Sequence, residues 1–123
     1  MINASPFVLI ENCTEAIKNY QKIFGGEIKI LNEQAGKVMN AELHLGGTLI
    51  HFADTMGKSV ASGRNIRILL QFDSEDEIKK IYNELKIEGK VDFELQKAFF
   101  GALHASLTDK NGINWDLNCF LAR

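Results

Sequence analysis

The spacing of apolar and polar residues predicts two similar runs of elements, one in each half of the chain. The first half opens with the apolar run Phe7–Ile10, and residues 16–24 then repeat apolar side chains at three- and four-residue spacing. This pattern predicts a strand followed by a helix, which the Gly25-Gly26 pair would end. The second half opens with the apolar run Ile68–Phe72 and a second helical pattern follows it. Each half is therefore expected to begin as a strand and a helix.

Both expected helices are preceded by the same polar signal. Asn12 is followed three residues later by Glu15, and Ser74 by Glu77. A capping residue with Glu three positions on is typical of a helix N-terminus, so we expect Asn12 and Ser74 to act as N-caps.

A constant offset relates the two halves. The two expected caps lie 62 residues apart, as do the two glutamates that follow them, and so do Tyr20 and Tyr82. An offset close to half of the 123 residues indicates that one unit has been duplicated.

Three strand-like segments follow each expected helix. They are 27–31, 37–45 and 48–53 in the first half, and 91–95, 101–108 and 113–118 in the second. The turns Gly46-Gly47 and 109–112 connect the last two strands of each set. Each half is therefore predicted to form a βαβββ unit, and the whole chain an α+β fold.

The size of the chain favours a single domain over residues 1–123. A hydrophobic content of 46% in 123 residues is enough for one core of ordinary size. Within this domain we expect repeat one at about 1–54, a linker rich in Gly and Ser at about 55–65, and repeat two at about 66–123.

Charge and composition indicate which classes of partner the protein can bind and in which cellular compartment it lies. The net charge is −2 and no run of Lys or Arg occurs, so we expect no nucleic-acid or membrane partner. No apolar stretch reaches the roughly 20 residues of a membrane span, and the first residues lack the pattern of a secretory signal. The two cysteines lack metal-type spacing and are expected to be free thiols, partly buried. These features predict a cytoplasmic protein whose partners are small molecules or other proteins.

Polar residues gather on one face of the hairpin in the first half. Side chains alternate along a strand, and a two-residue turn would place Glu42 directly opposite His51, with Asn40 and His44 beside them. Glu42 and His51 would make a general-base pair, or else a polar cross-strand pair that lines a wet cavity. We expect His44, which is nearest the turn, to be solvated.

The second half places charged residues at equivalent positions. Arg67 and Gln71 lie on the face opposite the apolar side chains of their strand, and Asp116 alternates with Trp115, which is assigned to the core. When the two halves are aligned on their final turns, His51 corresponds to Asp116, and the first strands align Ser5 with Arg67. Arg67 and Asp116 would form an ion pair, or Arg67 would hold an anionic ligand.

The order and spacing of five segments resemble the vicinal oxygen chelate superfamily, which includes glyoxalase I, bleomycin-resistance proteins and extradiol dioxygenases, and especially its small PhnB-like branch. These segments are 15–26, 39–43, 49–54, 99–101 and 107–115. The resemblance implies a paired βαβββ fold with cupped sheets around a cavity, and a homodimer. Phe100 and His104 lie on or before a strand that would wall this cavity, or would pack in the core or at the surface.

The resemblance also implies metal ligands at four positions, which correspond here to Ser5, His51, Arg67 and Asp116. Ser5 is a poor ligand, and the guanidinium of Arg67 offers no lone pair. Glu42 would have to complete a set of His51, Glu42 and Asp116 for Zn, Ni, Fe or Mn. We therefore expect an incomplete metal site and no resident cofactor.

Three hypotheses for function follow. The first is a small-molecule-binding protein whose ligand contacts Asn40, His44, Arg67, Gln71, Phe100 and Asp116. The second is a metal-dependent lyase, isomerase or dioxygenase-like enzyme that uses His51, Glu42 and Asp116, with His51 and Glu42 as catalytic residues. The third is a resistance protein that sequesters an antibiotic. A methyltransferase is not expected, because no glycine-rich loop follows a strand to hold a nucleoside cofactor.

Overall fold

A computed structural model describes residues 1–61 and 63–121 of the chain. Ser62 of the expected linker and the last two residues of the expected second repeat lie outside the described residues. The chain divides within that linker into two compact units, of which the first is Met1–Ala61 and the second contains the described residues from 63 onward. Each unit contains one copy of the predicted repeat.

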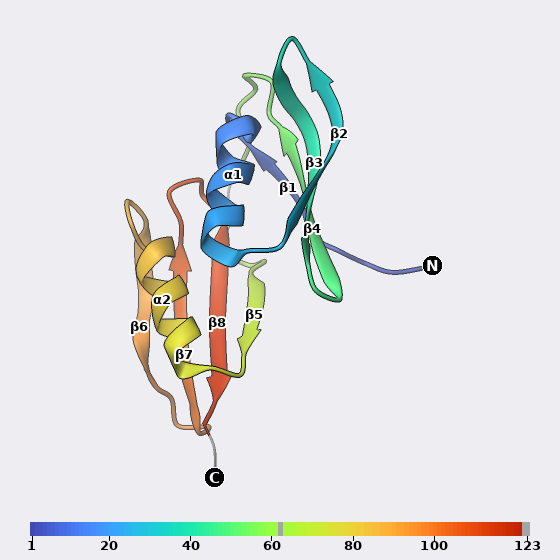
Figure 1. The fold of residues 1–123 in the computed structure, drawn as a ribbon. Coiled ribbons are helices and arrows are strands. Elements are labelled where there is room, and N and C mark those ends of the chain that lie inside the picture. The colour runs from blue at the N-terminus through green and yellow to red at the C-terminus, as the bar shows by residue number, and fades with distance from the viewer. Residues whose placement is uncertain (62, 122–123) are drawn as a thin grey trace. The chain divides into compact units, whose positions relative to one another are not determined.

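The first unit is a four-stranded sheet with one helix (Figure 1). The strand order is β1-β4-β3-β2; β1 runs parallel to β4, and the other neighbours are antiparallel. The elements are β1 (Phe7–Ile10), α1 (Cys13–Phe24), β2 (Glu27–Gln34), β3 (Lys37–Leu45) and β4 (Thr48–Asp54).

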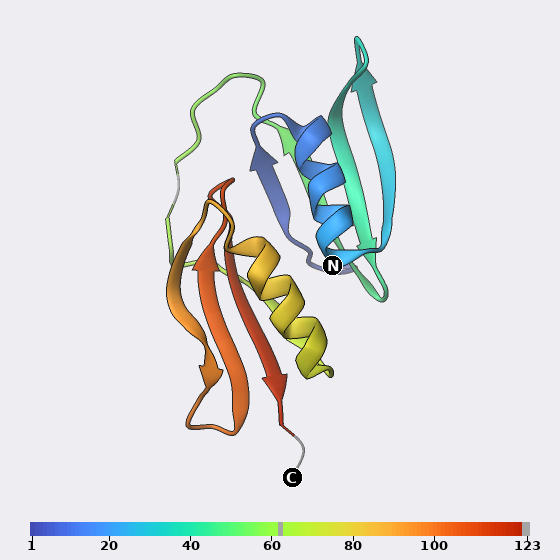
Figure 2. The ribbon, with the colours of Figure 1, turned by 60° about the vertical axis from the view of Figure 1, so that its left-hand side comes forward.

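The second unit repeats this topology (Figure 2). Its strand order is β5-β8-β7-β6, with β5 parallel to β8. The elements are β5 (Ile68–Phe72), α2 (Glu75–Leu85), β6 (Lys90–Lys97), β7 (Ala102–Thr108) and β8 (Asn114–Phe120). The prediction of an α+β fold with two βαβββ units is thereby confirmed.

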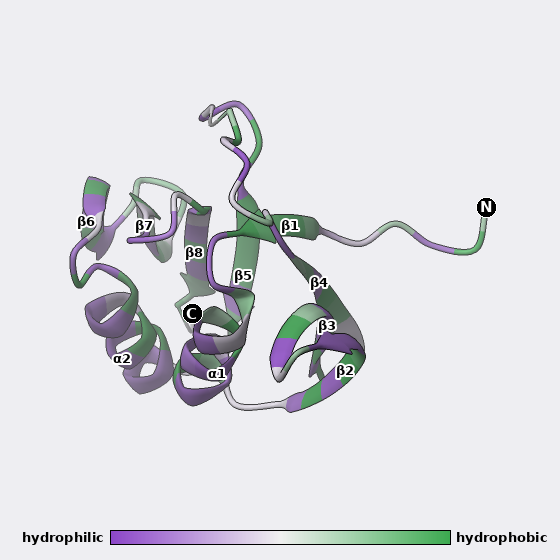
Figure 3. Cartoon of the chain, turned by 90° about the horizontal axis from the view of Figure 1, so that it is seen from above, coloured by the Kyte–Doolittle hydropathy of each residue, from purple (hydrophilic) through white to green (hydrophobic). Residues whose placement is uncertain are grey.

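One face of each sheet is buried against the helix of its own unit. In the first unit Tyr20 of α1 stacks on Phe52 of β4, with ring centroids 5.3 Å apart. In the second unit Ile78 of α2 is buried, as are Trp115 and Leu117 of β8. Figure 3 shows hydrophilic residues along both helices, which is expected when only one stripe of each helix is apolar and buried. In the part of the chain that the structure describes, neither helix has the length and apolar run needed to cross a membrane.

The two helices begin in different ways. Ser74 caps α2 as predicted, because its hydroxyl accepts a hydrogen bond from the Glu77 N–H at 3.2 Å. The prediction for Asn12 is wrong: this residue adopts a left-handed conformation with φ of 54°, and its side chain makes no capping bond. A carboxylate oxygen of Asp54 in β4 accepts the hydrogen bond from the Cys13 N–H instead, at 3.0 Å. The start of α1 is therefore held by the sheet of its own unit.

Candidate functional site

The face of the first sheet that lies opposite α1, called here the first open face, carries the polar residues predicted from the hairpin. The Gly46-Gly47 turn sets the register that pairs Glu42 with His51 and Asn40 with Ala53. His51 also pairs with Phe7 of β1, and their rings stack with centroids 6.0 Å apart. The structure therefore brings Glu42 and His51 together.

Glu42 lies between two imidazoles. Its Oε1 is 2.8 Å from Nε2 of His44, and its Oε2 is 3.6 Å from Nδ1 of His51. The Glu42 side chain is only 16% exposed, against 41% for His44 and 29% for His51. The hydrogen bond with His44 lowers the pKa of Glu42, and the charges of His44, His51 and Lys29 add to this effect. His44 was expected to be solvated, yet it makes the shorter of the two contacts.

The second open face, on the side of the second sheet opposite α2, has its own carboxylate. Oδ1 of Asp116 in β8 lies 3.0 Å from Nε of Arg67 and accepts a hydrogen bond at 2.8 Å from the hydroxyl of Ser106 in β7. The Arg67 side chain is 44% exposed, whereas that of Asp116 is 19% exposed. The predicted ion pair is present, and Ser106 is a further partner.

Aromatic and amide groups lie farther along the second open face. His104 pairs with Asn118 across β7 and β8, and its Nδ1 is 3.3 Å from Oδ1 of that amide. The rings of Phe93 and Phe100 flank His104, at centroid distances of 5.9 and 5.6 Å. Gln71 of β5 pairs with Asn118 in the parallel register and is exposed. These three aromatic side chains, Phe93, Phe100 and His104, are called here the aromatic cluster.

Sequence reasoning missed Ser106 as a member of this face, and it placed Asn118 on the face by strand alternation without naming it as a site residue. Both side chains are buried, with exposures of 8% and 5%. The predicted four-residue turn 109–112 would have paired Ser106 with Trp115, and only the observed five-residue connection 109–113 places Ser106 opposite Asp116.

The strand registers support the predicted equivalence of positions in the two units. Phe7 pairs with His51 in the first unit, and Leu69 pairs with Asp116 in the second. Ser5 precedes Phe7 by two residues, as Arg67 precedes Leu69. The two alignments that were drawn from the sequence are therefore consistent with the pairing of the strands.

The described residues contain no group of three or more His, Cys, Asp or Glu side chains that could hold a metal ion. The set of His51, Glu42 and Asp116 takes residues from both units, so it stays a prediction, as does a cavity shared by the two open faces.

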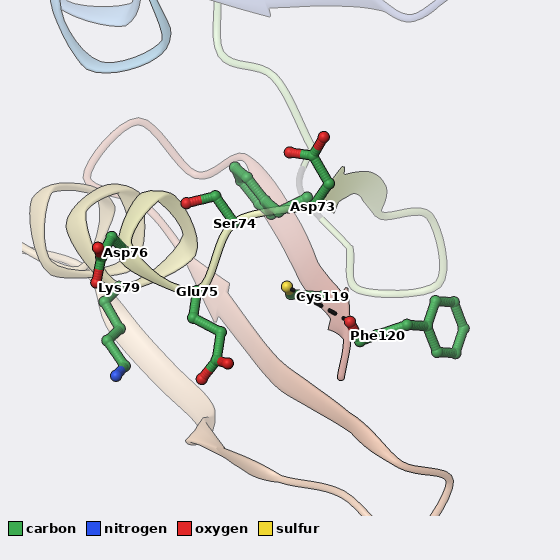
Figure 4. Close-up of a pocket in the computed structure, with 8 residues that line it drawn as sticks. Asp73, Ser74, Glu75, Asp76, Lys79, Cys119 and Phe120 are labelled. Atoms are coloured by element: carbon green, nitrogen blue, oxygen red, sulfur yellow. Dashed lines mark hydrogen bonds between the residues drawn. The ribbon is translucent and has the colours of Figure 1, made fainter. Parts of the chain in front are cut away.

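A separate hollow of about 640 Å³ lies at the N-terminus of α2 (Figure 4). Carboxylates surround it, and the Cys119 thiol, which donates a weak hydrogen bond to the Phe120 carbonyl, also lines it. Burial and the charges of Glu75 and Asp73 raise the pKa of Cys119. Burial and Asp54 likewise raise the pKa of Cys13 to about 11. Both thiols are free and buried, so neither is activated as a nucleophile.

Solved structures with the same fold come from several bacteria. Protein PA1353 from Pseudomonas aeruginosa matches with a TM-score of 0.84 and 24% identity, over 98% of each chain. The PhnB protein from Bacillus cereus matches with a TM-score of 0.79 and 21% identity, over 95% of this chain and 98% of that one. The fosfomycin resistance protein FosX from Listeria monocytogenes is 13% identical with a TM-score of 0.73, over 98% and 96% of the two chains.

Comparisons of the sequence with known proteins identify the family. Protein YjdN from Escherichia coli (strain K12) is 24% identical over 87% of each chain. The model of the Glyoxalase/Bleomycin resistance protein/Dioxygenase superfamily matches residues 6–117, which is nearly the whole chain. With its two βαβββ units and this match, the chain belongs to the Glyoxalase/Bleomycin resistance protein/Dioxygenase superfamily.

Proposed function

We propose that the protein binds an organic small molecule without a resident divalent metal, and that the pair Arg67 and Asp116 takes the place of metal ligands in the second unit. The observation that carries the proposal is the 3.0 Å contact between Nε of Arg67 and Oδ1 of Asp116. The match to the superfamily model supports a fold that binds small molecules.

The donor chemistry of these positions does not fit a divalent ion. A guanidinium has no lone pair to donate and keeps its positive charge at every ordinary pH. Oδ1 of Asp116 already accepts a hydrogen bond from Ser106 and makes an ion pair with Nε of Arg67, so a metal at that oxygen would have to displace both contacts. At the position equivalent to Arg67, Ser5 offers only a neutral hydroxyl.

We propose ligand contacts on each of the two open faces, taken separately. Asn40, His44 and the pair of Glu42 and His51 would supply hydrogen bonds from the first, and Arg67, Gln71, Phe100 and Asp116 would line the second. We further propose that the protein acts as a homodimer in the cytoplasm, where its two buried free thiols would stay reduced. Size-exclusion chromatography with light scattering tests the dimer.

Calorimetric titration with Ni²⁺ and Zn²⁺ tests the absence of a metal site. We expect no saturable binding to the wild-type protein, and measurable affinity in an Arg67→Glu variant, which replaces the cation with a ligand. Tight binding of one ion per wild-type chain, lost in His51→Ala, would contradict the proposal.

A second candidate function is an isomerase or lyase of the glyoxalase type in which Glu42 and His51 move a proton. The position of the Glu42 carboxylate between two imidazoles favours it, since a carboxylate that orients an imidazole is a common general-base arrangement. Assays with methylglyoxal-glutathione adducts and with catechols, each with and without added divalent metals, test this candidate. Turnover that disappears in Glu42→Gln would support it, and equal rates with and without the protein would exclude it for these substrates.

A further inference from the structure

The aromatic cluster and the Arg67 side chain lie on one face of one unit. Ser106 pairs with Asp116, and His104 pairs with Asn118, so these four side chains point away from the buried residues Ala105 and Leu117 between them. The ring contacts of His104 bring Phe93 and Phe100 to the same face.

Arg67 makes its ion pair with Asp116 at one end of the guanidinium, which leaves the terminal NH₂ groups to bind another acceptor. Asp116 engages the Nε group, which is the donor nearest the side-chain stem. No other side-chain partner of Arg67 occurs among the described residues of the second unit, so its terminal NH₂ groups can receive a second acceptor. The contact at Nε limits the orientations of the guanidinium, which favours binding of a ligand carboxylate at the terminal NH₂ groups. A carboxylate bound there lies closer to the positive charge of Arg67 than to the negative charge of Asp116, so the attraction outweighs the repulsion.

The aromatic cluster offers an exposed surface for a ring. Phe93 is 40% exposed and Phe100 46% exposed, although both contact His104. His104 is held by the Asn118 amide, which is itself 5% exposed. Aromatic rings favour offset or edge-to-face contact with another ring, so the cluster selects a planar aromatic group over an aliphatic group of similar size.

The spacing of the two features suits one small ligand. Along β7, His104 lies two residues from Ser106, which is directly opposite Asp116 on the next strand. Sheet geometry therefore separates the Cα atoms of His104 and Asp116 by roughly 8 Å. The guanidinium of Arg67 lies beside Asp116, so an aromatic acid with its ring on the aromatic cluster is of the right size to bring its carboxylate to this end of the face.

We propose that the second open face binds aromatic carboxylic acids, with the aromatic cluster holding the ring and Arg67 holding the carboxylate. This inference rests on the proposed function, because it assigns a ligand class to part of the same site. It uses residues of the second unit alone.

Three probes of similar size separate the two contributions. Benzoate has both ring and charge, cyclohexanecarboxylate has the charge without the aromatic ring, and benzamide has the ring without the charge. In ¹H–¹⁵N NMR titrations of the whole protein, we expect benzoate to bind in the millimolar range. The largest amide shifts should lie at residues 93, 104, 106 and 116. The other two probes should bind at least about fivefold more weakly, since each loses one contribution.

Matched variants assign each contribution to a residue. Arg67→Gln should weaken benzoate about tenfold and leave benzamide unchanged, whereas Arg64→Gln, which removes a guanidinium paired with Asp92 in the same unit, should leave both unchanged. Phe93→Leu should weaken benzoate but not cyclohexanecarboxylate. Phe24→Leu, at a ring of α1 on the helix side of the first sheet, should change neither.

Several outcomes would overturn the inference. These are the absence of saturable benzoate shifts, shifts centred outside the second open face, equal affinity for the three probes, or an Arg64→Gln effect equal to that of Arg67→Gln. Each variant's own spectrum reports whether it is folded, and Arg67→Lys, which keeps the charge without the fork, is the second choice with an intermediate loss expected. A metal-loaded protein that still binds benzoate would contradict the proposed function and leave this inference standing. A metal-free protein that does not bind benzoate would contradict this inference and leave the proposed function standing.

Discussion

The two open faces have the same backbone plan and different chemistry. In the first unit a carboxylate, Glu42, lies between the imidazoles of His44 and His51. In the second unit a carboxylate, Asp116, lies between the guanidinium of Arg67 and the hydroxyl of Ser106. The first arrangement joins a carboxylate to two imidazoles, whereas the second joins a carboxylate to a permanent cation.

The buried faces of the two sheets have stayed alike where the open faces have diverged. On either side of the equivalent positions His51 and Asp116, the neighbouring residues are buried and apolar in both units, including Phe52 and Leu117. Close packing in a core penalises changes of volume and polarity, whereas a wet face tolerates a change of charge. Duplication therefore supplied one scaffold with two sets of polar side chains.

The largest expected loss of stability concerns the turn between the last two strands of each unit, which is built differently in the two units. The β3–β4 turn consists of two glycines, but the β7–β8 turn depends on Asp109, whose carboxylate accepts from the Trp115 indole at 2.8 Å and from the backbone N–H groups of Asn111 and Ile113. Asp109→Ala leaves these donors without that acceptor and should lower the free energy of unfolding by about 3 to 4 kcal/mol. Urea denaturation measures the loss. Asp76→Ala on the surface of α2 is the control, and an equal loss there would contradict the assigned role.

A smaller loss is expected where backbone passes close to glycine. A Cβ at Gly26 would collide with the His44 carbonyl oxygen, while one at Gly36 would meet nothing within 4 Å, and both residues have positive φ. Gly36→Ala should cost about 1 kcal/mol for its backbone conformation, and Gly26→Ala about 2 to 3 kcal/mol because the clash is added. Thermal unfolding of both variants tests this difference. Equal costs would show that the strand end moves aside freely.

The two helix starts should respond differently to pH. Hydrogen bonds from the backbone N–H groups of Cys13 and Met56 lower the pKa of Asp54 in the folded state. Its contribution is therefore fully present above the unfolded pKa of about 3.8, and is lost as pH falls through the lower folded value. Asp54→Ala should cost about 1 kcal/mol at pH 7 and less in acid. Ser74→Ala, which removes the neutral cap of α2, should cost a similar amount without this dependence, and parallel pH profiles for the two variants would contradict the account.

The smallest effect concerns the proton equilibrium of the first open face. Because the hydrogen bond from His44 is the main cause of the lowered Glu42 pKa, His44→Ala should return that pKa toward its ordinary value by more than His51→Ala does. Carboxyl ¹³C NMR titration of Glu42 measures both changes, and little effect on stability is expected. A larger shift in His51→Ala would show that the longer contact governs the carboxylate.

Much of the fold could be predicted because apolar spacing and turn residues act locally. The two-residue turn at Gly46-Gly47 fixed the pairing of Glu42 with His51, and Ser74 capped its helix as expected. The prediction that Asn12 caps α1 was wrong because Asp54, 42 residues away, accepts the hydrogen bond from the start of the helix instead. Such a tertiary contact leaves no local pattern in the sequence. Strands β2 and β6 extend beyond the predicted segments, since pairing with a neighbour can continue through bulges that the sequence does not mark.

The candidate site could be predicted only in part. The alternation of side chains along each strand placed the polar residues on the correct faces, but it does not predict the rotamer that a side chain adopts there. His44 could therefore be placed beside Glu42, while its 2.8 Å contact depended on side-chain geometry. Likewise, the pairing of Arg67 with Asp116 followed from the aligned units. The hydrogen bond from Ser106 to the same carboxylate oxygen could not be predicted, because it depends on how β7 pairs with β8.

The claim that Arg67 and Asp116 stand in place of metal ligands is tested most directly by the metal content of the protein as it is isolated from cells grown with Zn, Ni, Fe and Mn. Elemental analysis of the purified, undialysed protein should find each of these metals far below one equivalent per chain. One equivalent of any of them, retained through purification and lost in His51→Ala, would contradict the claim.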